Sequence, residues 1–407
     1  MAFAFAQNQQ QDNQYLLSEA TYEALDDINK LIESERYNDA VSQLQNLASR
    51  VADNAYEDAV VNQTLGYAYN GLQRYEQAAE AFIKAADSNA LPADVSHQLH
   101  YYIAQLLTQS EDYARAIRYF ERWRSQESGL SLEANKFAAG LYYSAKNNSK
   151  VIEHARAAIR QSERAEENLY QLLLATYFEM ERFSQAAELL EQMLALFPEN
   201  KEYWRQLVGA YQAANNDKKA VAANELAYAQ GVLDEKEKVQ LARMLLYMEA
   251  PFRAAQLLER ELANNGISRS AENLRLLADS YLFAREREAA AKTFGEAAAA
   301  SGNAEYYYRQ GQILAELESW DAVIEALEIA TSKDDFGEQA EAHLLLGIAA
   351  YKQERYSLAR QALQKAREAS RLREQAGYWL ERLEREQAEN NDEAVQQVKK
   401  PESDKNT

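Results

Sequence analysis

The stretch LGYAYNGLQRYEQAAEAF, from Leu65 to Phe82, carries the pattern that decides the fold. Its first half places Gly66 and Tyr69 in one helix, and its second half places Ala78 four residues before Phe82 in another. Glycine inside a helix costs about 1 kcal/mol relative to alanine. We therefore expect Gly66 and Ala78 to lie where two antiparallel helices approach closely, with Tyr69 and Phe82 filling the space around them.

The same order of residue sizes returns along the chain. A small residue that opens the second helix of each pair recurs at intervals of 33–38 residues. These anchor residues are Ala40, Ala78, Ala116, Val151, Ala186, Ala220, Ala254, Ala290, Val323 and Ala359. A period of this length indicates an array of helical hairpins in which each hairpin packs against its neighbours.

The composition favours an all-α fold and excludes several classes of function. Only 4 prolines and 13 glycines occur in 407 residues, and no segment alternates in the manner of a β-strand. The net charge of −20 argues against nucleic acid as a partner. The chain has no cysteine, so disulfides, thiolate zinc sites and a cysteine nucleophile are excluded. No apolar run approaches the roughly 20 residues that would form a transmembrane segment.

The period and the spacing within it resemble the tetratricopeptide-repeat (TPR) superfamily over about residues 21–373. The copies nearest to the family pattern are Tyr170–Tyr177 with Ala186, Trp204–Tyr211 with Ala220, Leu277–Tyr281 with Ala290, and Leu346–Gly347 with Ala359. This resemblance implies a right-handed TPR superhelix, an α-solenoid, of about ten helix-turn-helix repeats.

The ends of the chain differ from the repeats. We expect residues 15–373 to form the array and residues 371–389 to form a C-terminal capping helix, with Trp379 facing the core. Residues 1–14 and 390–407 have little to bury, so we expect them to be disordered. The first residues, with Ala4 and Ala6 flanking Phe5, also read as the remnant of a secretory signal peptide cleaved after Ala6.

Four segments are similar to one lineage of TPR proteins, the exported proteins encoded beside TonB–ExbB–ExbD genes in gamma-proteobacteria. They are Lys201–Tyr211, Ala227–Leu233, Pro251–Leu258 and Ala342–Leu363. The resemblance implies a periplasmic accessory of a TonB-dependent uptake system, with a component of that system as a partner. A cytosolic or envelope-assembly adaptor with another partner is the first alternative, and an enzyme or metal protein is the second.

Motifs for catalysis and cofactors are sparse. Neither a Gly-rich phosphate or dinucleotide motif nor a nucleophile elbow occurs. His97 and His100 would share one face of a helix, but two ligands without a nearby carboxylate pair are a weak metal motif. We therefore expect a non-catalytic protein-interaction scaffold without cofactor or metal.

The TPR resemblance implies a groove lined by the first helix of each hairpin, in which a partner would bind. Aromatic and arginine side chains are enriched at binding hot spots, so they are the candidates there. The register set by the anchors gives these projecting residues: Tyr67, Tyr101, Tyr143, Phe178, Arg205, Arg243, Tyr247, Arg275, Phe283, Tyr308 and Tyr351.

The three arginines of this set fall in consecutive repeats, which predicts a basic stripe in an otherwise acidic molecule. Such a stripe would accept an acidic group on an extended or helical segment of a protein partner. The alternative is that several of the tyrosines pack between neighbouring helices.

Overall fold

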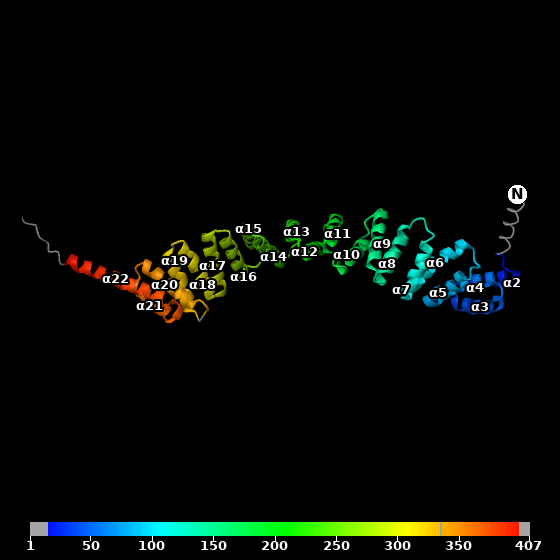
Figure 1. Ribbon diagram of the computed structural model, residues 1–407, viewed down its shortest axis with the longest axis horizontal. Helices are drawn as coiled ribbons and strands as arrows, with labels where there is room; N and C mark the ends of the chain where they lie inside the picture. Colours follow the sequence, from blue (N-terminus) through cyan, green and yellow to red (C-terminus); the bar gives the residue numbers. More distant parts are fainter. Residues whose placement is uncertain (1–14, 334–335, 399–407) are drawn as a thin grey trace, which may run out of the picture. The chain divides into compact units, whose positions relative to one another are not determined.

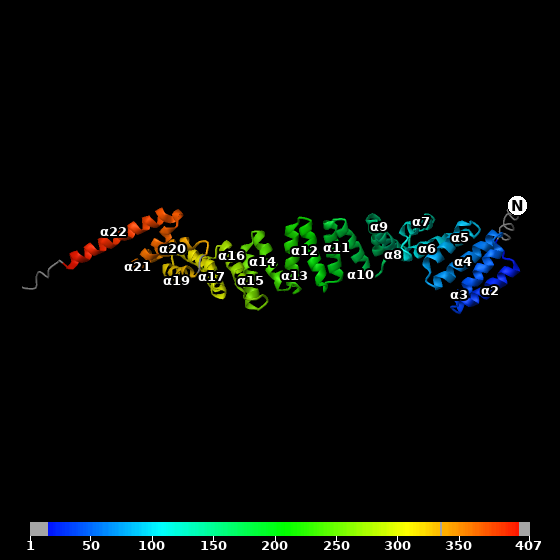
Figure 2. The same ribbon diagram turned by 90° about the horizontal axis from the view of Figure 1, so that it is seen from below.

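The computed structural model describes residues 15–333 and 336–398. Within these residues all regular elements are helices. Consecutive helices pair as ten antiparallel hairpins, and a last long helix follows them (Figures 1 and 2). We call the first helix of each hairpin helix A (even numbers, α2 to α20) and the second helix B (odd numbers, α3 to α21). The chain divides into two compact units between Pro198 and Glu199.

Unit 1 contains five hairpins. Their helices are α2 (Glu19–Glu33), α3 (Tyr37–Val51), α4 (Ala55–Gly71), α5 (Tyr75–Asp87), α6 (Ala93–Gln109), α7 (Tyr113–Arg124), α8 (Leu132–Ser144), α9 (Asn148–Gln161), α10 (Glu167–Glu179) and α11 (Phe183–Leu196).

Unit 2 contains the other five hairpins and the last helix. Its elements are α12 (Lys201–Ala213), α13 (Asp217–Ala229), α14 (Glu235–Tyr247), α15 (Pro251–Ala263), α16 (Ala271–Phe283), α17 (Arg287–Ser301), α18 (Ala304–Glu316), α19 (Trp320–Ser332), α20 (Gln339–Lys352), α21 (Tyr356–Glu368), the 3-10 turn η1 (Ser370–Leu372) and α22 (Arg373–Val398).

The anchors that set the repeat period all occupy one position in the fold. Each is the fourth residue of a helix B, from Ala40 in α3 to Ala359 in α21. All ten have an exposed fraction of 0%. Only small side chains fit where the two helices of a hairpin come this close, so the recurrence of alanine and valine in the sequence is a consequence of packing.

Gly66 of α4, Gly311 of α18 and Gly347 of α20 confirm that the hairpins close tightly. A Cβ atom built on Gly66 would lie 2.7 Å from the ring of Phe82 in the paired helix B. Gly347 has the same relation to Leu363, at 2.6 Å. The gain in interhelical contact at these positions offsets the lower helix propensity of glycine.

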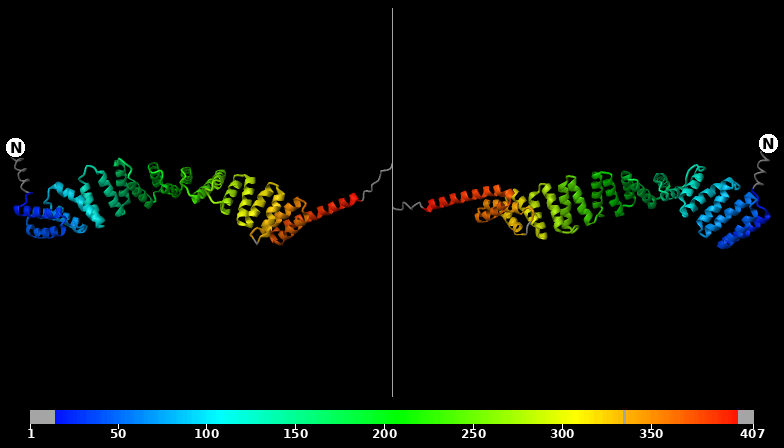
Figure 3. Two further views of the ribbon diagram at one scale, coloured as in Figure 1. Left: turned by 180° about the vertical axis from the view of Figure 1, so that it is seen from behind. Right: turned by 60° about the horizontal axis from the view of Figure 1, so that its bottom comes forward.

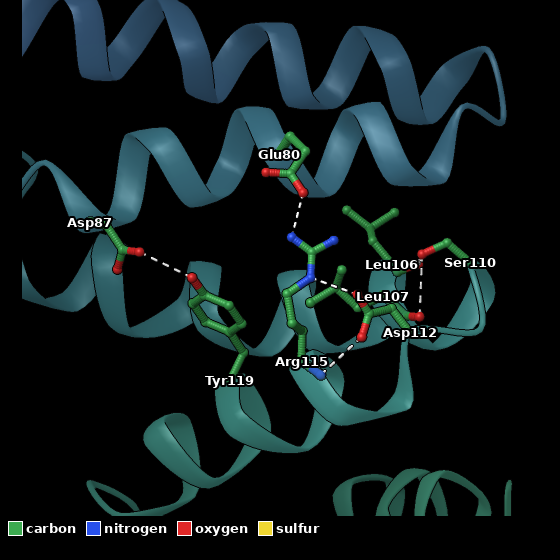
Figure 4. Close-up of polar contacts among 8 residues, drawn as sticks. All are labelled: Glu80, Asp87, Leu106, Leu107, Ser110, Asp112, Arg115 and Tyr119. Atoms are coloured by element: carbon green, nitrogen blue, oxygen red, sulfur yellow. Dashed lines mark hydrogen bonds and ion pairs between the residues drawn. The ribbon is translucent and has the colours of Figure 1, made fainter. Parts of the chain in front are cut away.

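Polar contacts join one helix B to the next, as Figure 4 shows for α5 and α7. Arg115 on α7 pairs with Glu80 on α5 and with its own N-cap residue Asp112, at 2.6 Å for the latter. The hydroxyl of Tyr119 donates to Asp87 at 3.0 Å. Such half-exposed ion pairs contribute little stability, so we infer that they mainly fix the register of neighbouring hairpins.

The turn from helix A to helix B has the same backbone geometry in all ten hairpins. One residue in each turn is left-handed, with φ between 53° and 66°, and none of them is glycine. Glu181 is an example, with φ 54°. The next residue, Arg182, donates its N–H to the carbonyl of Tyr177 five positions back at 2.8 Å, as in a Schellman cap.

Replacing Glu181 by glycine is expected to stabilise unit 1 by about 0.5–1 kcal/mol. Glycine removes the steric strain of the left-handed conformation, although it also gives the unfolded chain more freedom. Urea unfolding followed by circular dichroism measures the change. The control is Glu188→Gly within α11, where the same substitution should destabilise by about 1 kcal/mol. A Glu181→Gly protein no more stable than wild type would show that the turn is unstrained.

The last helix covers the end of the array. Ala376 and Leu383 of α22 are fully buried against α20 and α21. The helix does not end at residue 389 as expected but runs to Val398, past the ends of α20 and α21 (Figure 3). The prediction of disorder from residue 390 is therefore wrong for 390–398. Residues 1–14 and 399–407, with the predicted signal remnant, lie outside the described residues.

Candidate functional site

The eleven candidate residues all lie on A helices, as the anchor register predicts. Tyr67, Tyr101, Tyr143 and Phe178 belong to α4, α6, α8 and α10 of unit 1. The other seven belong to α12, α14, α16, α18 and α20 of unit 2. Each unit is therefore a separate candidate surface.

Three of the candidate tyrosines do not project into a groove. Tyr101 packs its ring against Trp123 of α7 at 4.4 Å and Phe137 of α8 at 5.4 Å, and burial raises its pKa. Tyr308 is buried, with its ring 6.0 Å from Phe336, and burial raises its pKa as well. In both places a large ring fills the space between hairpins, where its apolar area stabilises most.

Tyr351 is the third of these corrections, and the capping helix is the cause. Its ring lies 5.4 Å from Trp379 of α22, and the guanidinium of Arg382 lies 5.5 Å from its centroid. Its hydroxyl also donates to Glu386 of α22. Tyr351 therefore holds the cap in place.

Aromatic side chains at the ends of A helices are exposed. In unit 2, Tyr247 and Phe283 are the last residues of the successive helices α14 and α16, with exposed fractions of 76% and 68%. In unit 1, Tyr143 and Phe178 are each one residue from the end of α8 and α10. Tyr143 is exposed and its hydroxyl donates to Glu179 at 3.2 Å, whereas Phe178 is half-buried, 6.3 Å from the ring of Phe183.

The predicted basic stripe is largely neutralised within the molecule. Arg205 on α12 contacts the carboxylates of Glu202, Asp234 and Glu237, two of which come from the next hairpin. Arg275 pairs with Asp279 one turn later at 2.8 Å. Burial raises the pKa of Asp279, while Arg275 and Arg309 lower it and only partly compensate.

Arg243 on α14 is the remaining member of the stripe. It is exposed and has no ion pair among the described residues. Tyr247 follows it by one helical turn, so the two side chains share a face of α14. Of the three arginines of the predicted stripe, Arg243 is thus the one available to a partner, and it lies beside an exposed aromatic ring.

The anchor register missed the neighbour of Tyr101. Tyr102 is exposed and, with Tyr67, lines a pocket of about 370 Å³ between α4 and α6. Phe82 forms part of its lining, and the carboxamide residues Asn70, Gln105 and Gln109 also line it. The two adjacent aromatic residues at positions 101 and 102 could have indicated this surface. Adjacent residues on a helix point about 100° apart, so both cannot pack against the same neighbour.

A second pocket, of about 210 Å³, lies between α12 and α14 in unit 2. Of the candidate residues only Arg205 lines it. Trp204 and Gly209 of α12 and Asn224 of α13, which the anchor register did not select, also line it. Relative to the anchor residue of its hairpin, Gly209 lies one residue later than Gly66 and Gly347 do. The sequence therefore distinguishes it from these packing glycines.

The two neighbouring histidines have different surroundings. His97 lies on α6 with its Nε2 atom 2.7 Å from the carboxylate of Glu127. His100 is buried next to Tyr119, neither of its ring nitrogens has a partner in the described residues, and burial lowers its pKa. In the part of the chain that the structure describes, no three histidine or carboxylate side chains are grouped as metal ligands. None of the described helices is long and apolar enough to cross a membrane.

Comparison with known families supports the TPR family. Residues 64–131 and 320–373 match one tetratricopeptide-repeat family, and residues 177–234 match another. The matched segments include hairpins of both units. No curated protein matches the sequence. The resemblance to TonB-associated proteins is not supported by these matches.

Several solved structures are similar to parts of the chain. A tetratricopeptide repeat protein from Parabacteroides merdae is 12% identical over 65% of this chain and 99% of its own, with a TM-score of 0.36. The C-terminal part of a TPR repeat-containing protein from Cytophaga hutchinsonii is 14% identical, over 68% and 94% respectively, with a TM-score of 0.36. The protein MamA is 18% identical over 43% and 94%, with a TM-score of 0.35. These likenesses are too low to bear on function.

Proposed function

We propose that this array of tetratricopeptide repeats is a non-catalytic scaffold that binds a segment of a partner protein on the A-helix face of unit 2. The observation that carries the proposal is the exposure of Tyr247 and Phe283 at the ends of two successive A helices, with the unpaired Arg243 one turn before Tyr247. Exposed aromatics beside an arginine are the residue types that dominate binding energy at interfaces.

The partner segment should carry an apolar side chain and an acidic group. The apolar side chain would cover Tyr247 and Phe283, which expose large rings to water. The acidic group would pair with Arg243, since the neighbouring Arg205 and Arg275 already have carboxylate partners. Because the molecule has a net charge of −20, most of its surface repels an acidic partner, and an exposed arginine attracts one.

A finer proposal concerns the setting. On the sequence resemblance alone, we propose a periplasmic accessory of a TonB-dependent uptake system, with a component of that system as the partner. A cytosolic or envelope-assembly adaptor with another partner is the alternative. Cell fractionation separates the periplasmic role from a cytosolic one, since a protein found only in the cytosol would exclude the periplasmic role.

Crosslinking from the position of Tyr247 tests the proposed site. A photoreactive phenylalanine analogue placed at residue 247 in cells should give discrete protein adducts, which mass spectrometry identifies. The substitution Arg243→Glu should reduce the yield of these adducts about tenfold, because it replaces an attractive charge pair by a repulsive one.

The matched control is Lys218→Glu on α13, an exposed residue in helix B that undergoes the same change of charge. It should leave the adducts unchanged. Equal yields from the Arg243→Glu and wild-type proteins, with helicity intact by circular dichroism, would remove this face from consideration. Adducts to a TonB-system component would support the finer proposal, and adducts only to cytosolic proteins would contradict it.

A further inference from the structure

The pocket between α12 and α14 has the size of an aromatic ring. Its volume is about 210 Å³, and a cavity of about 150 Å³ is already large enough to hold benzene. Apolar parts of Trp204, Val208, Leu233 and Met244 line it. All of these residues belong to unit 2, so the pocket is formed within one compact unit.

A polar group with unused hydrogen-bonding capacity lies in this lining. Asn224 of α13 is only 6% exposed, and its amide nitrogen contacts the sulfur of Met244 at 3.5 Å. The amide nitrogen of Gln212 lies 4.0 Å from the same sulfur. A thioether is a weak acceptor, and the carboxamide oxygen of Asn224 has no partner among the described residues. This oxygen is therefore available to accept a hydrogen bond from a group that enters the pocket.

A glycine keeps the pocket open on the side of α12. Gly209 lies inside the helix, and a Cβ atom built on it would have no heavy atom within 4 Å. Alanine would therefore fit and would favour the helix, in contrast to Gly66, where a ring blocks the space. The absence of a side chain at residue 209 leaves room for another molecule beside the backbone of α12.

We propose that this pocket receives a tryptophan or tyrosine side chain of a partner protein. The ring lies between Trp204 and Met244, and its indole N–H or phenol O–H donates to the oxygen of Asn224. The ion pair of Arg205 with Glu237 forms part of the surrounding rim. A ring enclosed by apolar groups and bordered by charged residues is the arrangement of a binding hot spot. The inference rests on the proposed function, because it assigns the ring to a protein partner.

Ligand-observed NMR on the intact chain tests the pocket without knowledge of the partner. The probes are the N-acetyl amides of tryptophan, tyrosine and phenylalanine. The tryptophan or the tyrosine probe should bind at least about fivefold more tightly than the phenylalanine probe, which lacks a ring donor. Asn224→Leu should abolish this preference, and Gly209→Leu should weaken the binding of the preferred probe about tenfold by filling the space beside α12.

The matched control is Gly140→Leu on α8, where a Cβ atom likewise meets nothing within 4 Å but the residue does not line the pocket between α12 and α14. It should leave probe binding unchanged. The proposal is overturned if no probe binds the wild-type protein, if the phenylalanine probe binds as well as the others, or if Gly209→Leu binds like wild type. Ring binding is measured independently of Arg243, so a failed crosslinking test of the proposed function would leave this result interpretable.

Discussion

Replacing Glu261 by leucine is expected to lower the free energy of unfolding of unit 2 by about 2–3 kcal/mol. Glu261 on α15 accepts hydrogen bonds from Lys238 of α14, at 2.6 Å, and from the hydroxyl of Tyr228 of α13. Removing one partner of a buried ion pair costs about 3–5 kcal/mol. The side chain of Lys238 is still 20% exposed and keeps some hydration, so we expect a loss at or below the lower end of this range. Denaturant unfolding measures the loss.

A glycine next to this carboxylate provides an independent test of the same contact. A Cβ atom on Gly266 would lie 2.0 Å from Glu261 Oε2 and 2.9 Å from Lys238 Nζ. Gly266→Ala should therefore displace the carboxylate and also destabilise the unit. The double variant with Glu261→Leu should be no less stable than Glu261→Leu alone, because the contact is already absent. Additive losses would contradict this account.

The contribution of Glu261 should depend on pH. Burial acts to raise its pKa, but the hydrogen bonds from Lys238 and Tyr228 outweigh burial and hold the pKa below its usual 4.5. A carboxylate whose pKa is lowered by folding stabilises the protein above pH 4.5, and this stabilisation is lost as the pH falls through the lowered value. The stability difference between wild type and Glu261→Leu should therefore narrow as the pH is lowered below 4.5.

The repeat architecture could be predicted from the sequence because its cause is local and recurs. Each hairpin needs a small residue at the fourth position of helix B, and the chain has ten of them, all fully buried. The capping helix could be predicted for a similar reason, since Ala376 and Leu383 recur at helical spacing. Its end could not, because the polar residues after Glu389 bear no periodic signal that distinguishes helix from coil.

The candidate surface could be predicted only in part, because exposure depends on neighbours distant in the sequence. Arg205 has the register of a free groove residue, but Glu237 reaches it from 32 residues away. Tyr351 has a similar register, but Trp379 of α22 packs against its ring. Tyr101 and Tyr102 are adjacent in the sequence. Tyr101 packs against the ring of Trp123 on α7, whereas Tyr102 lines the pocket between α4 and α6.

The close approach of α4 and α5 at Gly66 can be tested by enlarging this residue. A Cβ atom at residue 66 would lie 2.7 Å from the ring of Phe82, so a larger side chain there must displace this ring. Gly66→Leu should therefore destabilise unit 1 by about 1–3 kcal/mol. Since each hairpin contacts mainly its neighbours, loss of protection from hydrogen exchange should concentrate in α4, α5 and the adjoining helices.

Gly140→Leu on α8 separates this steric effect from helix propensity. It makes the same substitution in the same unit, but a Cβ atom at residue 140 would meet nothing within 4 Å. Leucine favours a helix over glycine, so this variant should be more stable than wild type by about 0.5–1 kcal/mol. The two substitutions should thus shift the urea midpoint of unit 1 in opposite directions. If Gly66→Leu were as stable as Gly140→Leu, the small residues of the repeat would reflect something other than the distance between the paired helices.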